Sequence, residues 1–123
     1  MERLKKHHLS LKNAFKGILW VITTEYNFQI HLVLAVFALI MGFLLQISSI
    51  EMIVIIFAIV LGLSAEMINT AIEELTDLVT VEWRKEAKIA KDVSAGMMLL
   101  ISLGTLVIGL FIFIPKLVAI TLY

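Results

Sequence analysis

The sequence predicts an all-α membrane protein with three transmembrane helices and an N-terminal amphipathic helix on the membrane surface. The 123-residue chain is 61% hydrophobic and 16% charged, which is more apolar than an ordinary soluble domain. Its apolar residues gather in three long stretches, and we expect spans at 30–47, 52–75 and 93–115, near the length that a helix needs to cross a bilayer. No internal repeat is present, so we expect one domain over residues 1–123.

Residues 1–24 are expected to form a helix that lies along the membrane surface. Leu11, Phe15, Ile18 and Ile22 recur at helical spacing on one face. Lysines lie to one side of this face, where they can contact anionic lipid headgroups. The alternative is an ordinary surface helix on a soluble core, which the long apolar stretches that follow disfavour.

Short polar segments separate the expected spans. Glu25 interrupts the pattern of the first helix and is expected at the membrane edge, just before the first span. A polar break at 46–51 separates the first two spans, and a polar segment of mixed charge at 76–91 separates the second from the third. The third span is uncharged, and Pro115 and Lys116 mark its far end.

The placement of basic residues predicts the orientation of the chain. Nine of the ten Lys and Arg residues fall in the N-terminal segment and in the polar segment 76–91, and none lies in the break at 46–51. Because basic loops tend to stay in the cytoplasm, we expect the N-terminus and residues 76–91 on the cytoplasmic side. The ten basic and ten acidic residues balance, so net charge gives no indication of a nucleic-acid partner.

One acidic stripe runs from the second expected span toward the cytoplasmic edge. Its members Glu66, Asn69, Glu73 and Asp77 are three or four residues apart. On a helix they lie within roughly 80° of one another, over a length of about 16 Å. Carboxylates at membrane depth are costly and usually mark a functional site, so this acidic stripe is the candidate site.

The acidic stripe and Glu25 are expected at the same membrane edge, where uncompensated carboxylates would repel one another. A hard divalent cation removes this repulsion, and Mg²⁺ prefers one or two carboxylates together with substrate phosphates. Lys91 would pair with phosphate as a point charge, and the deeper Glu66 would accept a proton from a hydroxyl. This combination suits phosphoryl transfer, although the P-loop and GxGxxG nucleotide motifs are absent. By composition and spacing alone, a small proton- or cation-coupled transporter remains open.

Two dense motifs resemble those of the prokaryotic diacylglycerol kinase family. They are AEMINTAIEELTD at 65–77 and KIAKDVSAG at 88–96, and the shorter stretches FKGI at 15–18 and NFQIHL at 27–32 also align. The resemblance covers nearly the whole chain, with the same plan of three spans. It implies a small homotrimeric enzyme of the bacterial cytoplasmic membrane that transfers the γ-phosphate of ATP to a lipid alcohol.

The resemblance also implies a role for each position that matches. Glu66 would be the general base, with Asn69 and Asp77 supporting the site, and Glu25 and Glu73 would hold Mg²⁺. The residues expected to contact ATP are Lys91 and Asp92, the stretch Glu82, Trp83 and Arg84, and, on the surface helix, Lys6 and Asn13.

Two lipid substrates are compatible with the family. The stretches NFQIHL, VTVEW at 79–83 and FIPK at 113–116 are most like the Gram-positive branch, which phosphorylates undecaprenol. Diacylglycerol is the alternative. One departure from that branch is Gln29, where an arginine is common. A transporter would instead move ions without phosphate transfer and would be indifferent to ATP.

Overall fold

The described part of the chain consists of four helices and their connections. The computed structural model describes residues 2–122, apart from the side chain of Leu4. Met1, the first residue of the expected surface helix, lies outside them. In chain order the helices are α1 (Glu2–Thr24), α2 (Tyr26–Leu44), α3 (Ser49–Val79) and α4 (Lys85–Thr121). The all-α fold that the sequence predicts is confirmed.

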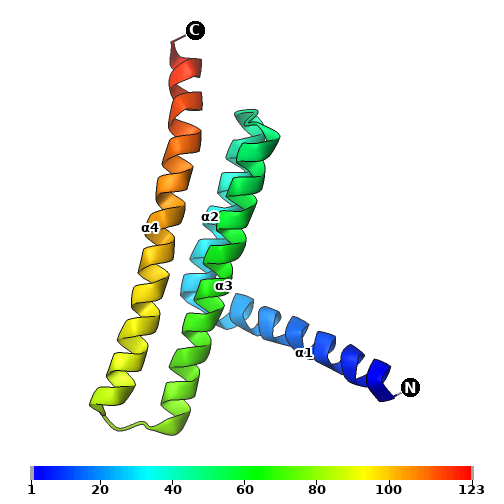
Figure 1. The fold of residues 1–123 in the computed structure, drawn as a ribbon, viewed down its shortest axis with the longest axis vertical. Coiled ribbons are helices and arrows are strands. Elements are labelled where there is room, and N and C mark those ends of the chain that lie inside the picture. The colour runs from blue at the N-terminus through cyan, green and yellow to red at the C-terminus, as the bar shows by residue number, and fades with distance from the viewer. Residues whose placement is uncertain (1, 123) are drawn as a thin grey trace.

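Helices α2, α3 and α4 run side by side as a bundle, and α1 projects away from it (Figure 1). Helix α3 packs most extensively on α4, and α2 packs on α3. The interior is narrow, because the three helices bury few apolar side chains. The apolar side chains that these three helices bury are Phe28, Ala35, Ile55, Ala58, Ala65, Met98 and Ile112.

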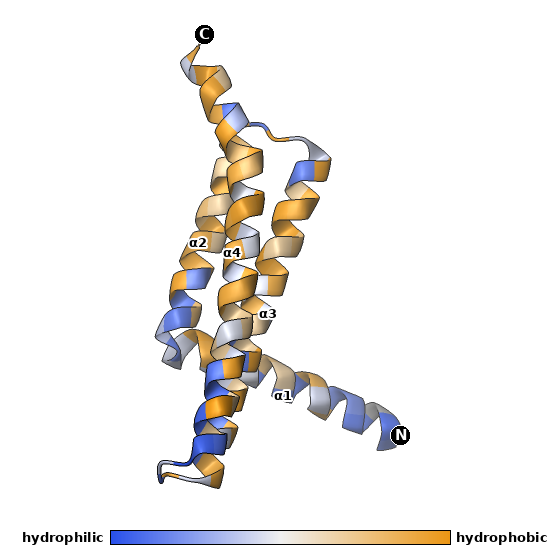
Figure 2. Ribbon diagram, turned by 60° about the vertical axis from the view of Figure 1, so that its left-hand side comes forward, coloured by the Kyte–Doolittle hydropathy of each residue, from blue (hydrophilic) through white to orange (hydrophobic). Residues whose placement is uncertain are grey.

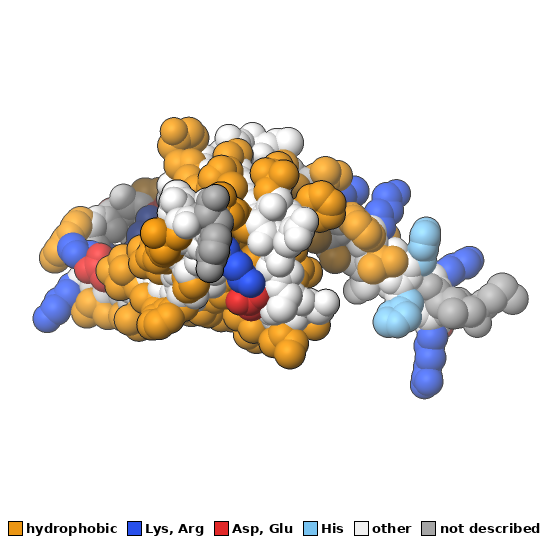
Figure 3. Space-filling view, turned by 90° about the horizontal axis from the view of Figure 1, so that it is seen from above, with side chains coloured by type: hydrophobic (Ala, Val, Ile, Leu, Met, Phe, Trp, Pro, Cys, Tyr) orange, Lys and Arg blue, Asp and Glu red, His pale blue; other side chains and the backbone are white. Residues whose placement is uncertain are grey.

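The outside of the bundle is apolar. Phe37, Phe57, Leu103 and Phe111 are all at least half exposed. Seen from the C-terminal end of the bundle, hydrophobic side chains cover most of the surface, whereas Lys, Arg and His side chains project from α1 (Figure 3). Such a surface suits the hydrocarbon of a bilayer. By length and composition, α2, α3 and α4 can each cross a membrane, so the expectation of three candidate spans is confirmed.

Polar residues gather at the end of the bundle where α3 connects to α4, and along the outer part of α1 (Figure 2). From Lys5 to Trp20, every side chain of α1 is exposed. No other described part of the chain therefore covers the apolar side chains of this segment. The position of α1 on the membrane surface stays a prediction.

Two hydrogen-bonded structures, a turn at the end of α2 and a cap at the start of α3, define the connection between these helices. Helix α2 ends in a turn in which Gln46 adopts a positive φ of 49° and the Ile47 N–H donates to the Gly42 carbonyl at 3.1 Å, as in a Schellman motif. Helix α3 then begins with a capping box. The Ser48 hydroxyl accepts from the Glu51 N–H at 3.2 Å, and the Glu51 carboxylate accepts from the Ser48 N–H at 2.7 Å.

The helices differ in extent from the expected spans. Helix α2 ends before residue 47 because of the turn at Gln46, and α4 continues past Pro115 to Thr121. Pro115 therefore does not mark the end of the helix. Proline lacks the N–H that would bond a carbonyl one turn earlier, but apolar surroundings favour a helix because its remaining backbone groups stay bonded. Lys116 then lies 3.7 Å from the Glu51 carboxylate, which joins α4 to the start of α3.

Candidate active site

The acidic stripe begins on the buried face of α3. Glu66 is only 3% exposed and Asn69 only 7%. One turn further along, Glu73 is half-buried, and Asp77 is exposed. The acidic stripe therefore passes from the interior of the bundle to its polar end, as the helical spacing predicts.

Glu66 lies near three other ionisable groups. These groups are His31 on α2, Glu25 at the start of α2, and Glu73 on its own helix. Glu25 is the single residue between α1 and α2, where its backbone is extended and its side chain makes no helix-capping hydrogen bond. The Glu25 carboxylate is therefore free of a capping role and lies in the same region as the acidic stripe.

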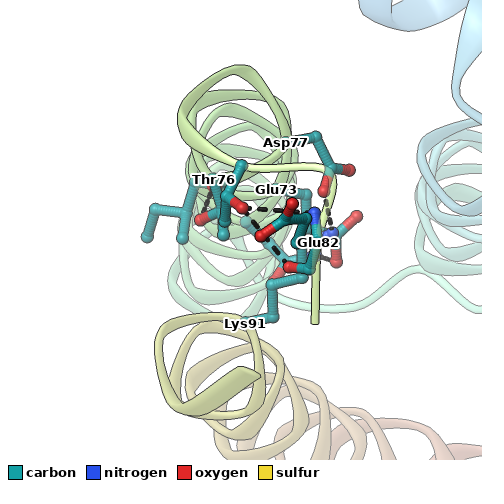
Figure 4. Close-up of polar contacts among 8 residues, drawn as sticks. Glu73, Thr76, Asp77, Glu82 and Lys91 are labelled. Atoms are coloured by element: carbon teal, nitrogen blue, oxygen red, sulfur yellow. Dashed lines mark hydrogen bonds and ion pairs between the residues drawn. The ribbon is translucent and has the colours of Figure 1, made fainter. Parts of the chain in front are cut away.

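Asn69 and Glu73 form a hydrogen-bonded pair on α3. The Asn69 Nδ2 donates to Glu73 Oε1 at 2.9 Å, and Figure 4 shows the surroundings of Glu73. Within the described residues, the buried Asn69 Oδ1 has no hydrogen-bond partner. A buried oxygen without a partner is destabilising unless a donor or a cation meets it. Carboxylate and amide oxygens are ligands that a hard cation takes, so these two residues fit Mg²⁺.

The described side chains do not by themselves form a complete metal site. Over residues 2–122, no three acidic, histidine or cysteine side chains gather closely enough to hold a metal by themselves. Mg²⁺ often keeps waters and takes further ligands from substrate phosphates. The Glu73 carboxylate and the free Asn69 amide oxygen thus suit a cation that binds together with a phosphate.

The far end of the acidic stripe is tied to α4 by an ion pair. Lys91 extends from α4 toward α3, and its Nζ lies 2.6 Å from Asp77 Oδ1 (Figure 4). The Ser94 hydroxyl donates to the Lys91 carbonyl at 3.0 Å. Asp92, the next predicted ATP contact, instead pairs with Lys88 on the exposed surface of α4. The fold therefore brings Lys91 to the acidic stripe and gives Asp92 a different partner.

The remaining predicted ATP-binding residues are exposed and lie in two separate segments. In the connection between α3 and α4, Glu82 and Arg84 pair at 3.8 Å, and Trp83 between them is 79% exposed. Lys6 and Asn13 lie on α1, which projects away from the bundle (Figure 1). One chain therefore does not bring Lys6 and Asn13 to the acidic stripe.

An apolar cavity of about 430 Å³ lies between α2, α3 and α4. Its wall includes Ala58, Gly62 and Leu63 of α3, and His31 of α2. Gly62 and Leu63 precede Glu66 by four and three residues, so they share its face of the helix. The acidic stripe therefore begins about one helical turn beyond this cavity.

Comparison with known proteins identifies the family of this chain. The sequence profile described as prokaryotic diacylglycerol kinase matches residues 12–113, a range that includes Glu25, Lys91 and the whole acidic stripe. The chain belongs to the prokaryotic diacylglycerol kinase family. The resemblance expected from the sequence motifs is thereby confirmed, although Lys6 lies outside the matched range.

Two relatives carry names that fit the family. The chain is 43% identical over 115 residues to a Bacillus subtilis protein named undecaprenol kinase, and the alignment covers 93% of each chain. It is 31% identical over 112 residues to a Synechocystis protein named diacylglycerol kinase. That alignment covers 90% of this chain and 64% of the Synechocystis protein. The chain is thus an enzyme of a lipid kinase family, for which ATP is the phosphate donor, and its three candidate spans fit a multi-pass membrane protein.

Sequence reasoning did not assign His31 to the candidate site. The structure places His31 on the cavity wall and near Glu66. The sequence does contain an indication of this position, because His31 is the single titratable side chain within 30–47. Ionisable residues inside a membrane span usually have a function.

Proposed function

We propose that this protein is an ATP- and Mg²⁺-dependent lipid kinase that phosphorylates the hydroxyl of undecaprenol. The choice of acceptor is supported by the relative named undecaprenol kinase, which is 43% identical and aligned over 93% of both chains. The structural observation that carries the proposal is the position of Glu66. This buried carboxylate lies about one turn beyond the apolar cavity and at the start of the acidic stripe. A hydrocarbon chain in the cavity would bring its terminal hydroxyl to that boundary.

Each side chain of the site has a distinct role in the proposed reaction. Glu66 accepts the proton of the lipid hydroxyl as the hydroxyl oxygen forms a bond to the γ-phosphorus of ATP. The bond from that phosphorus to the β–γ bridging oxygen breaks, and ADP leaves. Glu25, Glu73 and the Asn69 carbonyl would hold Mg²⁺, which when bound neutralises charge on the phosphates. Lys91, held by Asp77, pairs with a phosphate oxygen as a point charge.

The site is proposed on the cytoplasmic side of the membrane, in a homotrimer. Basic residues on α1 and at the start of α4 support this orientation. The extensive exposed apolar surface of one chain supports burial against other subunits as well as lipid. Lys6 and Asn13 would then reach an acidic stripe from a neighbouring subunit.

Parallel acceptor assays test the proposal. Purified protein in mixed micelles receives Mg²⁺ and γ-labelled ATP with either undecaprenol or diacylglycerol, and label in the lipid fraction is counted. We expect strong labelling of undecaprenol. Preference for diacylglycerol would keep the kinase and overturn the proposed acceptor. No label in either lipid, with folding verified, would contradict the proposed function and favour the transporter.

A further inference from the structure

The junction between α1 and α2 consists of the single residue Glu25. Its N–H donates to the Val21 carbonyl at 3.0 Å, and its carbonyl accepts from the Gln29 N–H at 3.1 Å. The backbone thus ties Glu25 to both helices. Because α1 projects away from the bundle (Figure 1) and contacts it only sparsely, the direction of the Glu25 side chain depends on how firmly this junction is held.

One side chain crosses the junction. The Gln29 Nε2 donates to the Ile22 carbonyl at 3.0 Å, which links the beginning of α2 to the last turn of α1. Within residues 2–122 this is the only side-chain hydrogen bond that joins the two helices. Carbonyls in the last turn of a helix lack partners within that helix, so Ile22 has an acceptor available for Gln29. The bond is partly buried, where water competes with it less.

We propose that Gln29 is a positioning residue that holds the Glu25 carboxylate toward Glu66 and Glu73 by binding the Ile22 carbonyl across the junction. The inference rests on the proposed function, in which Glu25 is a Mg²⁺ ligand. Gln29 needs no contact with the metal or with ATP for this role. Without its N–H donor, the junction turns more freely at Glu25, and a ligand that points in several directions binds a metal less tightly.

Substitutions at Gln29 separate the hydrogen bond from the bulk of the side chain. Gln29→Met keeps the length and removes the donor, whereas Gln29→Arg keeps N–H donors. Asn27→Met changes an exposed residue in the first turn of α2 and serves as the control. Binding of Mn²⁺ in place of Mg²⁺, followed by electron paramagnetic resonance with a non-hydrolysable ATP analogue, gives a readout that does not depend on turnover.

We expect Gln29→Met to weaken Mn²⁺ binding about ten-fold, the lower end of the effect seen when a residue that orients a metal ligand is replaced. Binding should return toward the wild-type value in Gln29→Arg and stay unchanged in Asn27→Met. In phosphate transfer, the Mg²⁺ concentration for half-maximal rate should rise by the same factor, while the rate at saturating Mg²⁺ stays close to wild type. A merely structural role would lower the thermal midpoint without this shift in metal affinity.

A double substitution tests whether Gln29 acts through Glu25. In a Glu25→Gln background, Gln29→Met should weaken Mn²⁺ binding no further, because the ligand that it positions is already lost. Unchanged Mn²⁺ affinity in Gln29→Met, in a protein whose wild type transfers phosphate, would overturn this inference alone. A wild type that labels neither lipid would overturn the proposed function and this inference together.

Discussion

Asp77 on α3 and Lys91 on α4 form an ion pair at 2.6 Å that joins the two longest helices near their connection. The Lys91 side chain is 36% exposed and that of Asp77 is 63% exposed. An ion pair this open to water adds at most about 1 kcal/mol to stability. Its main consequence is therefore geometric, because it holds the Lys91 ammonium at the end of the acidic stripe.

Removing the charge of Asp77 should weaken ATP binding more than it weakens the fold. Asp77→Asn loses the ionic partner of Lys91, so we expect the KM for Mg-ATP to rise about ten-fold, the lower end of what the loss of one hydrogen bond to a charged group causes. Steady-state kinetics and thermal unfolding in detergent measure the two effects. Glu86→Gln, at an exposed position in the first turn of α4, is the control. A KM equal to that of wild type would remove Asp77 from the positioning of Lys91.

Neutralising Glu73 should weaken the binding of Mg-ATP by at least about ten-fold, as expected for loss of a metal-site carboxylate. Glu73→Gln keeps an oxygen that can accept from Asn69 Nδ2, so the pair on α3 can persist while the negative charge is lost. Equilibrium binding of Mg-ATP measures the effect. The neighbouring exposed residue offers the matched control Glu74→Gln, which should bind as wild type does. Equal binding by Glu73→Gln and wild type would take Glu73 out of the metal site.

The capping box at the start of α3 yields a prediction about stability. Ser48→Ala removes the hydroxyl that accepts from the Glu51 N–H, and loss of an N-cap side chain typically costs about 1 kcal/mol. Denaturation in detergent should show this loss, with phosphate transfer by the folded protein unchanged, because this cap lies far along α3 from Glu66. Ser49→Ala, one residue later, should have little effect. A stability equal to that of wild type would mean that Ser48 does not stabilise the helix start.

Features that depend on periodicity along one helix could be predicted from the sequence. The spacing of Glu66, Asn69 and Glu73 places them on one face, and the structure indeed buries the first two and half-buries the third. The break at Glu25 and the polar break at 46–51 are also visible in the sequence, because a charged residue or a cluster of polar residues interrupts the apolar pattern.

Features that depend on contacts between segments could not be predicted in this way. The pairing of Lys91 with Asp77 requires the particular packing of α3 on α4, and spacing within one helix carries no information about it. The Gln29 bond to Ile22 requires the angle between α1 and α2. The passage of α4 beyond Pro115 was also unexpected, because proline usually weakens a helix in water, whereas apolar surroundings favour its continuation.

The most direct test of the central claim is the rate of phosphate transfer by a Glu66→Gln protein. At saturating Mg-ATP and undecaprenol, single-turnover measurement should show a fall of at least about 100-fold, as expected when a general base is removed. Nucleotide binding should stay close to wild type, and Glu74→Gln should transfer phosphate at the wild-type rate. A folded Glu66→Gln protein that transfers phosphate at a rate near wild type would contradict Glu66 as the base and the reaction site proposed around it.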